Sequence, residues 1–146
     1  MPPNIYLDID GVLLTNDRLA APFAQEFLAY VLLRYPDTTY WLTTHCHGDA
    51  MEPIRNVGHF FSADTVLLMK KIKATDWGTA KTDGIDFSKP FLWFDDCCFP
   101  FEKAVLKKHG VLGNWIEVDL YKNPNQLKDL IRNFPTPVKK NDKRTG

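Results

Sequence analysis

Short apolar runs alternate along the chain with segments in which hydrophobic residues recur at the spacing of a helix. The apolar runs predict strands at 5–9, 40–43, 91–94 and 115–118. The helical spacing predicts helices at 22–35, 49–56, 79–85, 100–109 and 123–134. The fully apolar run 91–94 is typical of a strand that is buried on both faces. This alternation predicts an α/β fold with a mainly parallel central sheet.

The region 66–74 has no single interpretation. Residues 66–69 and residues 72–74 form two short apolar runs, and each is a strand candidate. Such runs are too short to show the periodicity of hydrophobic residues that distinguishes a strand from a buried part of a helix.

The composition is that of one ordinary globular domain. The chain has 146 residues, of which 45% are hydrophobic and 25% are charged. These proportions exclude a fibrous or wholly disordered protein. We expect a single domain over residues 1–135. Residues 136–146 are poor in hydrophobic and rich in basic side chains, so we expect a disordered basic tail there.

Charge balance and cysteine content narrow the setting of the protein. Lysine and arginine number 18 and match the 18 acidic residues, which excludes a basic nucleic-acid footprint over the molecule as a whole. Cys46, Cys97 and Cys98 are odd in number and indicate free thiols in a reducing compartment. No signal peptide is recognisable, and no apolar run approaches the ~20 residues of a membrane span. We therefore expect a cytoplasmic protein without a membrane partner.

Acidic residues gather where two predicted strands end. Asp8 and Asp10 lie at the end of the first strand, and Asp95 and Asp96 follow the central run 91–94. Ligands of open parallel sheets bind at the carboxyl ends of the strands. Carboxylates that meet there repel one another unless a cation lies among them. Oxygen ligands in a small site suit Mg²⁺, which also binds and polarises phosphate groups.

Three other residues fit a phosphate at the same edge. Thr43 ends the second strand, with Thr44 as the alternative hydroxyl. Lys81 precedes the central strand and can neutralise an anionic group, with Lys73 as the rival lysine. Gly11 allows a tight turn in which backbone N–H groups approach a phosphate.

In this order, the segments Asp8-Ile9-Asp10-Gly11-Val12-Leu13, Trp41-Leu42-Thr43-Thr44, Lys81 and Phe91-Leu92-Trp93-Phe94-Asp95-Asp96 resemble motifs I to IV of the haloacid dehalogenase (HAD) superfamily. The resemblance implies a three-layer, Rossmann-like core of HAD type. It also implies a Mg²⁺-dependent phosphatase that hydrolyses phosphomonoesters. In the family, phosphatases and mutases carry a second acid at the position of Asp10.

The resemblance also implies a role for each matched residue. Asp8 would be the nucleophile that forms an aspartyl-phosphate, and Asp10 the general acid and base, with its backbone carbonyl on Mg²⁺. Thr43 and Lys81 would hold the phosphoryl oxygens. Asp95 would ligate Mg²⁺, and Asp96 would ligate it through water or orient Lys81.

The spacing of the motifs leaves no room for the large cap domain that many members of the family carry. Residues 11–42 must supply a helix and a strand, and residues 44–80 must do the same. We expect an open site without a cap. Such a site suits a large phosphorylated substrate, or one enclosed by a partner that supplies the lid. A nucleotide, a nucleic-acid end, a phosphoprotein and a sugar phosphate all stay open.

Other functions are compatible with parts of this pattern. A non-catalytic binding or regulatory domain could keep the same site. A phospho-acceptor receiver domain also uses an acidic pair, a threonine and a lysine, but in another order along the chain. The run His45-Cys46-His47 contains zinc ligands without the usual paired spacing, so its residues are expected to line the phosphate site after Thr43 or to be polar loop residues. Cys97 and Cys98 are poor nucleophiles beside carboxylates, and Phe99 and Phe101 are either core or substrate contacts.

Overall fold

The structure is a computed structural model that describes residues 1–139. Its sheet has four parallel strands in the order β2-β1-β3-β4: β1 (Asn4–Leu7), β2 (Thr39–Trp41), β3 (Phe91–Asp95) and β4 (Trp115–Glu117). The register places Leu7 opposite both Trp41 and Phe94. The residues that follow β1, β2 and β3 therefore meet at one edge of the sheet, as the alternation of elements predicts.

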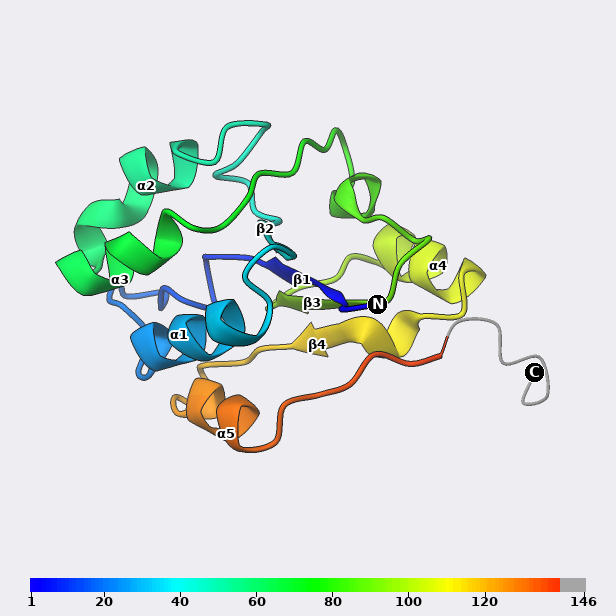
Figure 1. Ribbon diagram of the computed structural model, residues 1–146. Helices are drawn as coiled ribbons and strands as arrows, with labels where there is room; N and C mark the ends of the chain where they lie inside the picture. The colour runs from blue at the N-terminus through cyan, green and yellow to red at the C-terminus, as the bar shows by residue number, and fades with distance from the viewer. Residues whose placement is uncertain (140–146) are drawn as a thin grey trace.

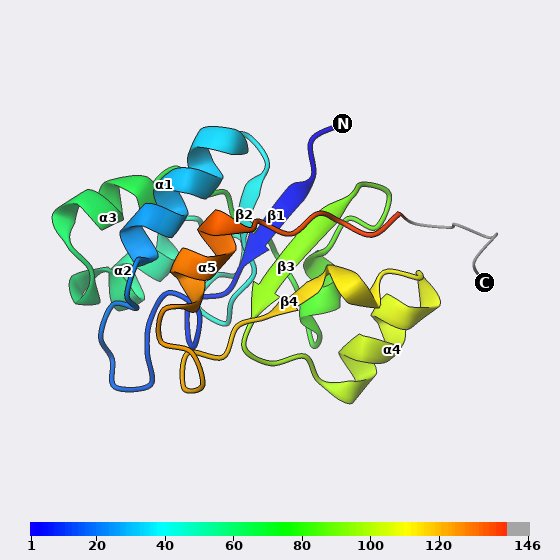
Figure 2. The ribbon, with the colours of Figure 1, turned by 90° about the horizontal axis from the view of Figure 1, so that it is seen from below.

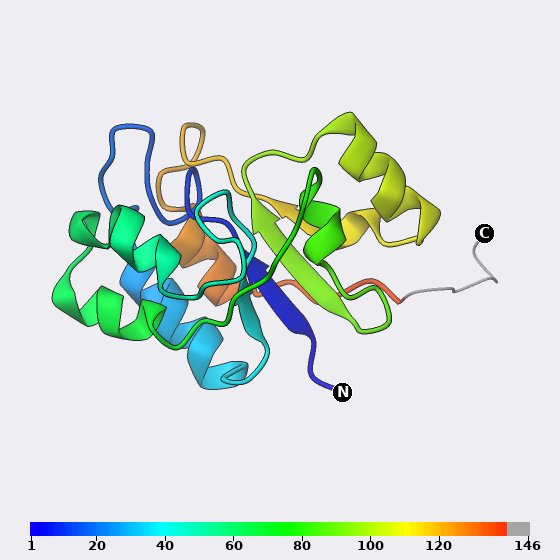
Figure 3. The same cartoon turned by 90° about the horizontal axis from the view of Figure 1, so that it is seen from above.

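The helices cover both faces of this sheet. They are α1 (Ala24–Arg34), α2 (Glu52–Val57), α3 (Ala63–Met69), α4 (Pro100–Lys108) and α5 (Gln126–Arg132), with 3₁₀ turns η1 (Gly58–Phe60), η2 (Lys81–Gly84) and η3 (Leu112–Asn114). Figures 1 and 2 show α1 and α5 on one face, with α4 on the other. Seen from above, α2 and α3 lie on the β2 side of the sheet (Figure 3).

The strand residues alternate between two hydrophobic clusters. Leu7 and Phe94 are buried with α1 and α5, whereas Tyr6 and Trp93 are buried with Leu106 of α4. This two-sided burial explains why the run 91–94 has no polar residue. The prediction of an α/β fold with a parallel sheet is confirmed, and the fold is compatible with a Rossmann-like arrangement.

Of the two strand candidates in the region 66–74, residues 66–69 belong to the helix α3 instead. Ser62 caps this helix, since its Oγ accepts a hydrogen bond of 3.1 Å from the Thr65 N–H. Thr65 and Met69, one helical turn apart, are its buried residues. Residues 72–74 contribute only an isolated parallel bridge between Lys73 and Tyr40 on the outer side of β2.

The loop after β1 forms a small flap, residues 11–20, before α1 begins. Its backbone closes through hydrogen bonds from Gly11 N to Leu14 O at 2.8 Å and from Thr15 N to Leu19 O at 2.8 Å. The chain then enters α1 through Phe23 in a left-handed conformation, φ 65°, instead of with Pro22 at the first helical position. Residues 11–42 are thus used by the flap, α1 and β2.

Part of the predicted tail contacts the domain. The Val138 N–H donates a hydrogen bond of 2.6 Å to Asn114 Oδ1, a contact that the composition did not predict. Residues 140–146, with most of the basic side chains, lie outside the described residues. No helix among the described residues is both long and apolar enough to cross a membrane.

Candidate active site

Two buried carboxylates meet where β1 and β3 end. Asp8 directly follows β1, and Asp95 is the last residue of β3. Asp8 is 4% exposed and Asp95 is 1% exposed. The Asp8 N–H donates to Phe94 O at 3.0 Å, which continues the pairing of the two strands up to the site. Asp8 Oδ1 accepts a hydrogen bond of 2.7 Å from the Ile9 N–H. The nucleophile candidate is therefore held in one orientation.

Lys81 lies between these carboxylates. Its Nζ is 2.7 Å from Asp95 Oδ2 and 3.3 Å from Asp8 Oδ2. The rival Lys73 donates instead to Asp37 O at 2.8 Å, away from these acids. The structure thus brings together Asp8, Asp95 and Lys81, and leaves Lys73 out.

The site holds two buried acids against one ammonium group. Burial and then the charge of Asp8 raise the pKa of Asp95 to about 9, although the charge of Lys81 opposes both effects. Burial likewise raises the pKa of Asp8 against the opposing charge of Lys81. Burial lowers the pKa of Lys81, but the charges of Asp8 and Asp95 outweigh this effect and raise it above its usual 10.5. The arrangement therefore favours uptake of a proton or a further cation.

A third carboxylate completes a set of metal ligands. Asp8, Asp95 and Asp96 each offer an oxygen, and these oxygens lie within 4.8 Å of one another. Within residues 1–139 this is the one group of three or more His, Cys, Asp or Glu side chains that could hold a metal ion. A purely carboxylate set suits a hard cation, so the residues present fit Mg²⁺.

Gly11 makes room for Asp96. Its φ is +81°, and a Cβ built there would overlap the Asp96 carboxylate. The Gly11 N–H, predicted to approach a phosphate, donates to Leu14 O within the flap. Its contribution to the site is therefore space and turn geometry.

Asp10 lies at the rim of the same site and is held from two sides. His45 Nε2 is 3.0 Å from Asp10 Oδ2, and Arg18 Nη1 from the flap is 3.7 Å from Asp10 Oδ1. The Asp10 side chain is 49% exposed, so it can exchange protons with water or substrate. From the sequence, His45 is expected either to line the phosphate site or to be a polar loop residue, and Arg18 has no predicted role.

The two threonines after β2 have different places. Thr43 is fully buried, and its Oγ1 accepts from the His45 N–H at 3.3 Å. Its hydroxyl also favours the charged form of Asp8 and so lowers the pKa of that carboxyl. Thr44 lines the cavity above Asp8. Thr43 therefore supports the nucleophile candidate, and Thr44 is the threonine that borders the space where a phosphate would bind.

Glu102 is a site residue that the sequence reasoning missed. It is 2% exposed, and its carboxylate accepts from the Lys81 N–H at 2.9 Å and from the Phe99 N–H at 3.0 Å. It thereby joins η2, which carries Lys81, to the start of α4. A glutamate three residues after a helix cap is a local signal for the second contact, but nothing in the sequence indicates the first.

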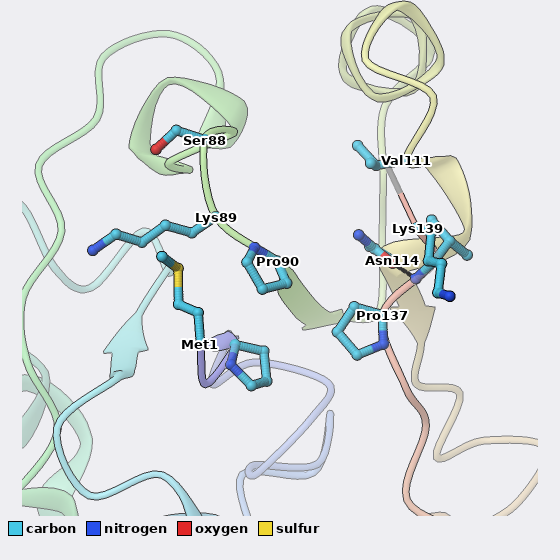
Figure 4. A pocket seen from close by; sticks show the side chains of 10 residues that line it. Met1, Ser88, Lys89, Pro90, Val111, Asn114, Pro137 and Lys139 are labelled. Carbon is cyan, nitrogen blue, oxygen red and sulfur yellow. Dashed lines mark hydrogen bonds between the residues drawn. The ribbon is translucent and has the colours of Figure 1, made fainter. Parts of the chain in front are cut away.

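A cavity of about 240 Å³ lies over these groups. Its lining residues are Asp8, Asp10, Thr44, Trp77, Thr79, Lys81, Asp95, Asp96, Cys97, Phe99 and Glu102. A larger cavity of about 520 Å³ lies at the opposite edge of the sheet, where β3 begins, between Met1, Pro90 and Pro137 (Figure 4). No carboxylate lines that larger cavity, so it is not the predicted phosphate site.

The cysteines have no catalytic arrangement in the described part of the chain. Cys46 is buried, its Sγ lies 3.5 Å from Asp49 O, and burial raises the pKa of its thiol. Burial and the nearby Glu102 raise the pKa of Cys98 to about 12. Cys97 is exposed as a residue. Partial desolvation of its thiol raises the pKa of that thiol, and the negative charges of Asp95 and Asp96 raise it further. Raised values disfavour the thiolate, as the sequence predicts.

Comparison with known proteins does not add to this description. A scan against models of protein families, a search of curated proteins and a search of solved structures each found no match.

Proposed function

We propose that the protein is a Mg²⁺-dependent phosphatase of HAD type that hydrolyses phosphomonoesters through an aspartyl-phosphate on Asp8. The observation that carries the proposal is the ion-paired group of Asp8, Lys81 and Asp95 at the base of the cavity, with Asp10 at its rim. These are the groups that transfer of a phosphoryl group to a carboxylate needs: a nucleophile, a counter-charge and a proton donor.

In the first step, an Asp8 carboxylate oxygen attacks phosphorus and the bond from phosphorus to the ester oxygen breaks. The departing oxygen takes a proton from Asp10, whose exposed carboxyl is within reach of the cavity. The Lys81 ammonium group stabilises the negative charge on the phosphoryl oxygens. The contact of Lys81 with Asp8 supports this role, because it places the ammonium group beside the oxygen that would carry the phosphoryl group.

In the second step, a water molecule gives a proton to Asp10 and attacks the aspartyl-phosphate. The bond between phosphorus and Asp8 breaks, inorganic phosphate leaves and the Asp8 carboxylate is restored. The contacts of Asp10 with His45 and Arg18 support its use in both steps, because they hold one carboxylate in one place.

Asp8, Asp95 and Asp96 would hold the Mg²⁺ ion. When bound, the ion offsets the excess negative charge of the acids and polarises the phosphoryl group. The close approach of the three carboxylates supports this assignment.

The test is release of p-nitrophenol from p-nitrophenyl phosphate, with and without Mg²⁺. Asp8→Asn should lower turnover about a thousandfold or more, since it removes the nucleophile. Asp64→Asn, on the exposed face of α3, is the matched control and should leave turnover unchanged. Full activity of Asp8→Asn would overturn the mechanism. Binding of Mg²⁺ without turnover of any phosphomonoester would favour a regulatory domain that keeps the site.

A further inference from the structure

Two aromatic side chains line the same cavity as Asp8 and Lys81. Trp77 belongs to the segment that precedes η2, and Phe99 directly precedes α4. They therefore reach the cavity from different segments of the chain. The proposed chemistry of the phosphoryl group uses neither of them.

Both rings are supported by their neighbours. The Trp77 indole Nε1–H donates to Thr43 O at 3.3 Å, and its ring packs on His47 with centroids 5.3 Å apart. The Phe99 ring is stacked on Phe101, with centroids 5.7 Å apart and an angle of 7° between planes. Phe99 is nevertheless 53% exposed. An exposed but supported ring beside a charged site is suited to stacking against a flat ligand.

The size and charge of the cavity limit the ligand further. Its volume of about 240 Å³ lies below the ~300–1,000 Å³ that is usual for larger ligands. Its lining holds five carboxyl groups and one ammonium group, that of Lys81. A substrate with several phosphates, or a nucleic-acid strand, would meet repulsion there. The lining favours a small ester with one phosphate and an uncharged remainder.

A second cavity, of about 550 Å³, lies between the flap and the loop before α5 and shares Gly11 and Asp96 with the site. Its walls include Leu19, Leu120 and Tyr121, but neither Asp8 nor Lys81 lines it. A phosphoryl group that reaches Asp8 through the smaller cavity brings its leaving group alongside Trp77 and Phe99 instead.

We infer that the substrate is a small phosphomonoester whose leaving group carries a flat, uncharged ring, and that Trp77 and Phe99 determine this specificity by stacking. The inference rests on the proposed function. Both a nucleoside monophosphate and an aryl phosphate have this chemistry. The two aromatic rings replace part of the shielding that a cap would give, so a capless site need not imply the large substrate expected from the sequence.

The test compares adenosine 5′-monophosphate with ribose 5-phosphate in the presence of Mg²⁺. Both esters release a primary alcohol and differ by the base alone. We expect kcat/KM to be at least about tenfold higher for the nucleotide, the ratio that one base–aromatic stack supplies. Phe99→Leu should remove most of this preference, through a higher KM for the nucleotide. Trp77→Leu should act in the same direction. Equal kcat/KM values for the two esters would overturn the inference.

Control variants separate this site from its surroundings. Tyr121→Leu changes the second cavity and should keep the nucleotide preference. Phe101→Leu removes the ring that supports Phe99 from outside the cavity, and it should lower the preference less than Phe99→Leu does. A loss in Tyr121→Leu with none in Phe99→Leu would overturn the inference. So would faster turnover of a short oligonucleotide with a terminal phosphate than of the mononucleotide. Phenyl phosphate separates a site for nucleoside monophosphates from a site for aryl phosphates. In a site specific for aryl phosphates, Phe99→Leu would lower turnover of phenyl phosphate and leave turnover of the nucleotide unchanged.

Failure of the proposed function is distinguishable from failure of this inference. If no ester is hydrolysed, including p-nitrophenyl phosphate, the phosphatase proposal fails. Binding of adenosine 5′-monophosphate to the Asp8→Asn variant in the presence of Mg²⁺ then tests the aromatic site alone. Quenching of tryptophan fluorescence would monitor this binding. Binding that weakens about tenfold on adding Phe99→Leu supports the stacking role. Binding that does not change with Phe99→Leu overturns it.

Discussion

His45 Nε2 lies 3.0 Å from Asp10 Oδ2, so a ring carried by the loop after β2 fixes the carboxylate that follows β1. Arg18 approaches the other oxygen of the same carboxylate from the flap, and its guanidinium also lies 4.9 Å from the ring centroid of Phe60. Asp10 is thus fixed by two elements besides its own. A group that must first donate and then accept a proton requires such a fixed position.

Replacement of His45 tests this positioning role. His45→Ala should lower kcat about tenfold and change KM little, because phosphate binding does not use the imidazole. His45→Gln, which keeps a hydrogen-bonding group, should recover part of kcat. His109→Ala, at the end of α4 and stacked on Phe87 away from the cavity, is the matched control. Steady-state kinetics with p-nitrophenyl phosphate would decide, and a change in KM alone would argue against the role.

The stability of the metal-free protein should fall as pH rises. The pKa of Asp95 is raised to about 9 when folded and returns to about 3.9 when unfolded. Between these values the folded state binds more protons, so the free energy of unfolding decreases by up to about 1.4 kcal/mol per pH unit for one proton. The stabilisation is complete below pH 4 and lost as pH passes 9.

Urea unfolding in EDTA at several pH values would measure this loss. Asp95→Asn removes the titrating group and should flatten the profile. Added Mg²⁺ should restore stability at high pH, because an ion bound to the folded state takes the place of the proton. A wild-type profile that is flat in EDTA would contradict the assignment.

Glu102 should matter for both stability and turnover. Glu102→Ala removes the acceptor of two partly buried hydrogen bonds, from the N–H groups of Lys81 and Phe99, which should cost about 1–3 kcal/mol of unfolding free energy. Turnover should fall as well, because η2 positions Lys81. Glu26→Ala, exposed on α1, is the control for loss of a helical glutamate. Urea unfolding and kinetics on the same samples would check both effects.

Alanine variants of two glycines with positive φ, Gly11 and Gly110, distinguish backbone strain from the space that the Asp96 side chain needs. Gly11→Ala should both destabilise the protein and weaken Mg²⁺ binding, because its Cβ would displace the Asp96 carboxylate. Gly110→Ala has a similar φ of +71° and nothing within 4 Å of its Cβ. It should show the strain alone, about 1 kcal/mol. Calorimetric titration with Mg²⁺ should separate them, and equal Mg²⁺ affinity in the two variants would refute this reading of Gly11.

The fold class and the acidic edge of the sheet could be predicted because their signals are local. The run 91–94 is apolar throughout and is followed by Asp95. Residues 5–7 are likewise hydrophobic and are followed by Asp8. Parallel pairing then brings two strand ends together without further information. The helix α3 was not predicted at residues 66–69, because a short apolar run has no resolvable period.

The supporting contacts of the site could not be predicted, since each joins segments distant in sequence. The contacts of His45 with Asp10 and of Glu102 with Lys81 depend on how loops from different strands pack. The different places of Thr43 and Thr44 depend on where β2 ends, at Trp41. Sequence patterns indicate which residue types gather at an edge, but tertiary packing decides which atoms meet.

The pairing of Leu7 with Phe94 has a consequence for folding. Asp8 and Asp95 come from segments far apart in the chain and are neighbours only after β1 and β3 have closed side by side. The ammonium group that separates them sits on η2, which must dock on α4 through Glu102. A partly folded chain therefore has the acids but no assembled site. If the proposed phosphatase activity is present, its recovery during refolding should mark completion of the central sheet and should lag behind the formation of the helices.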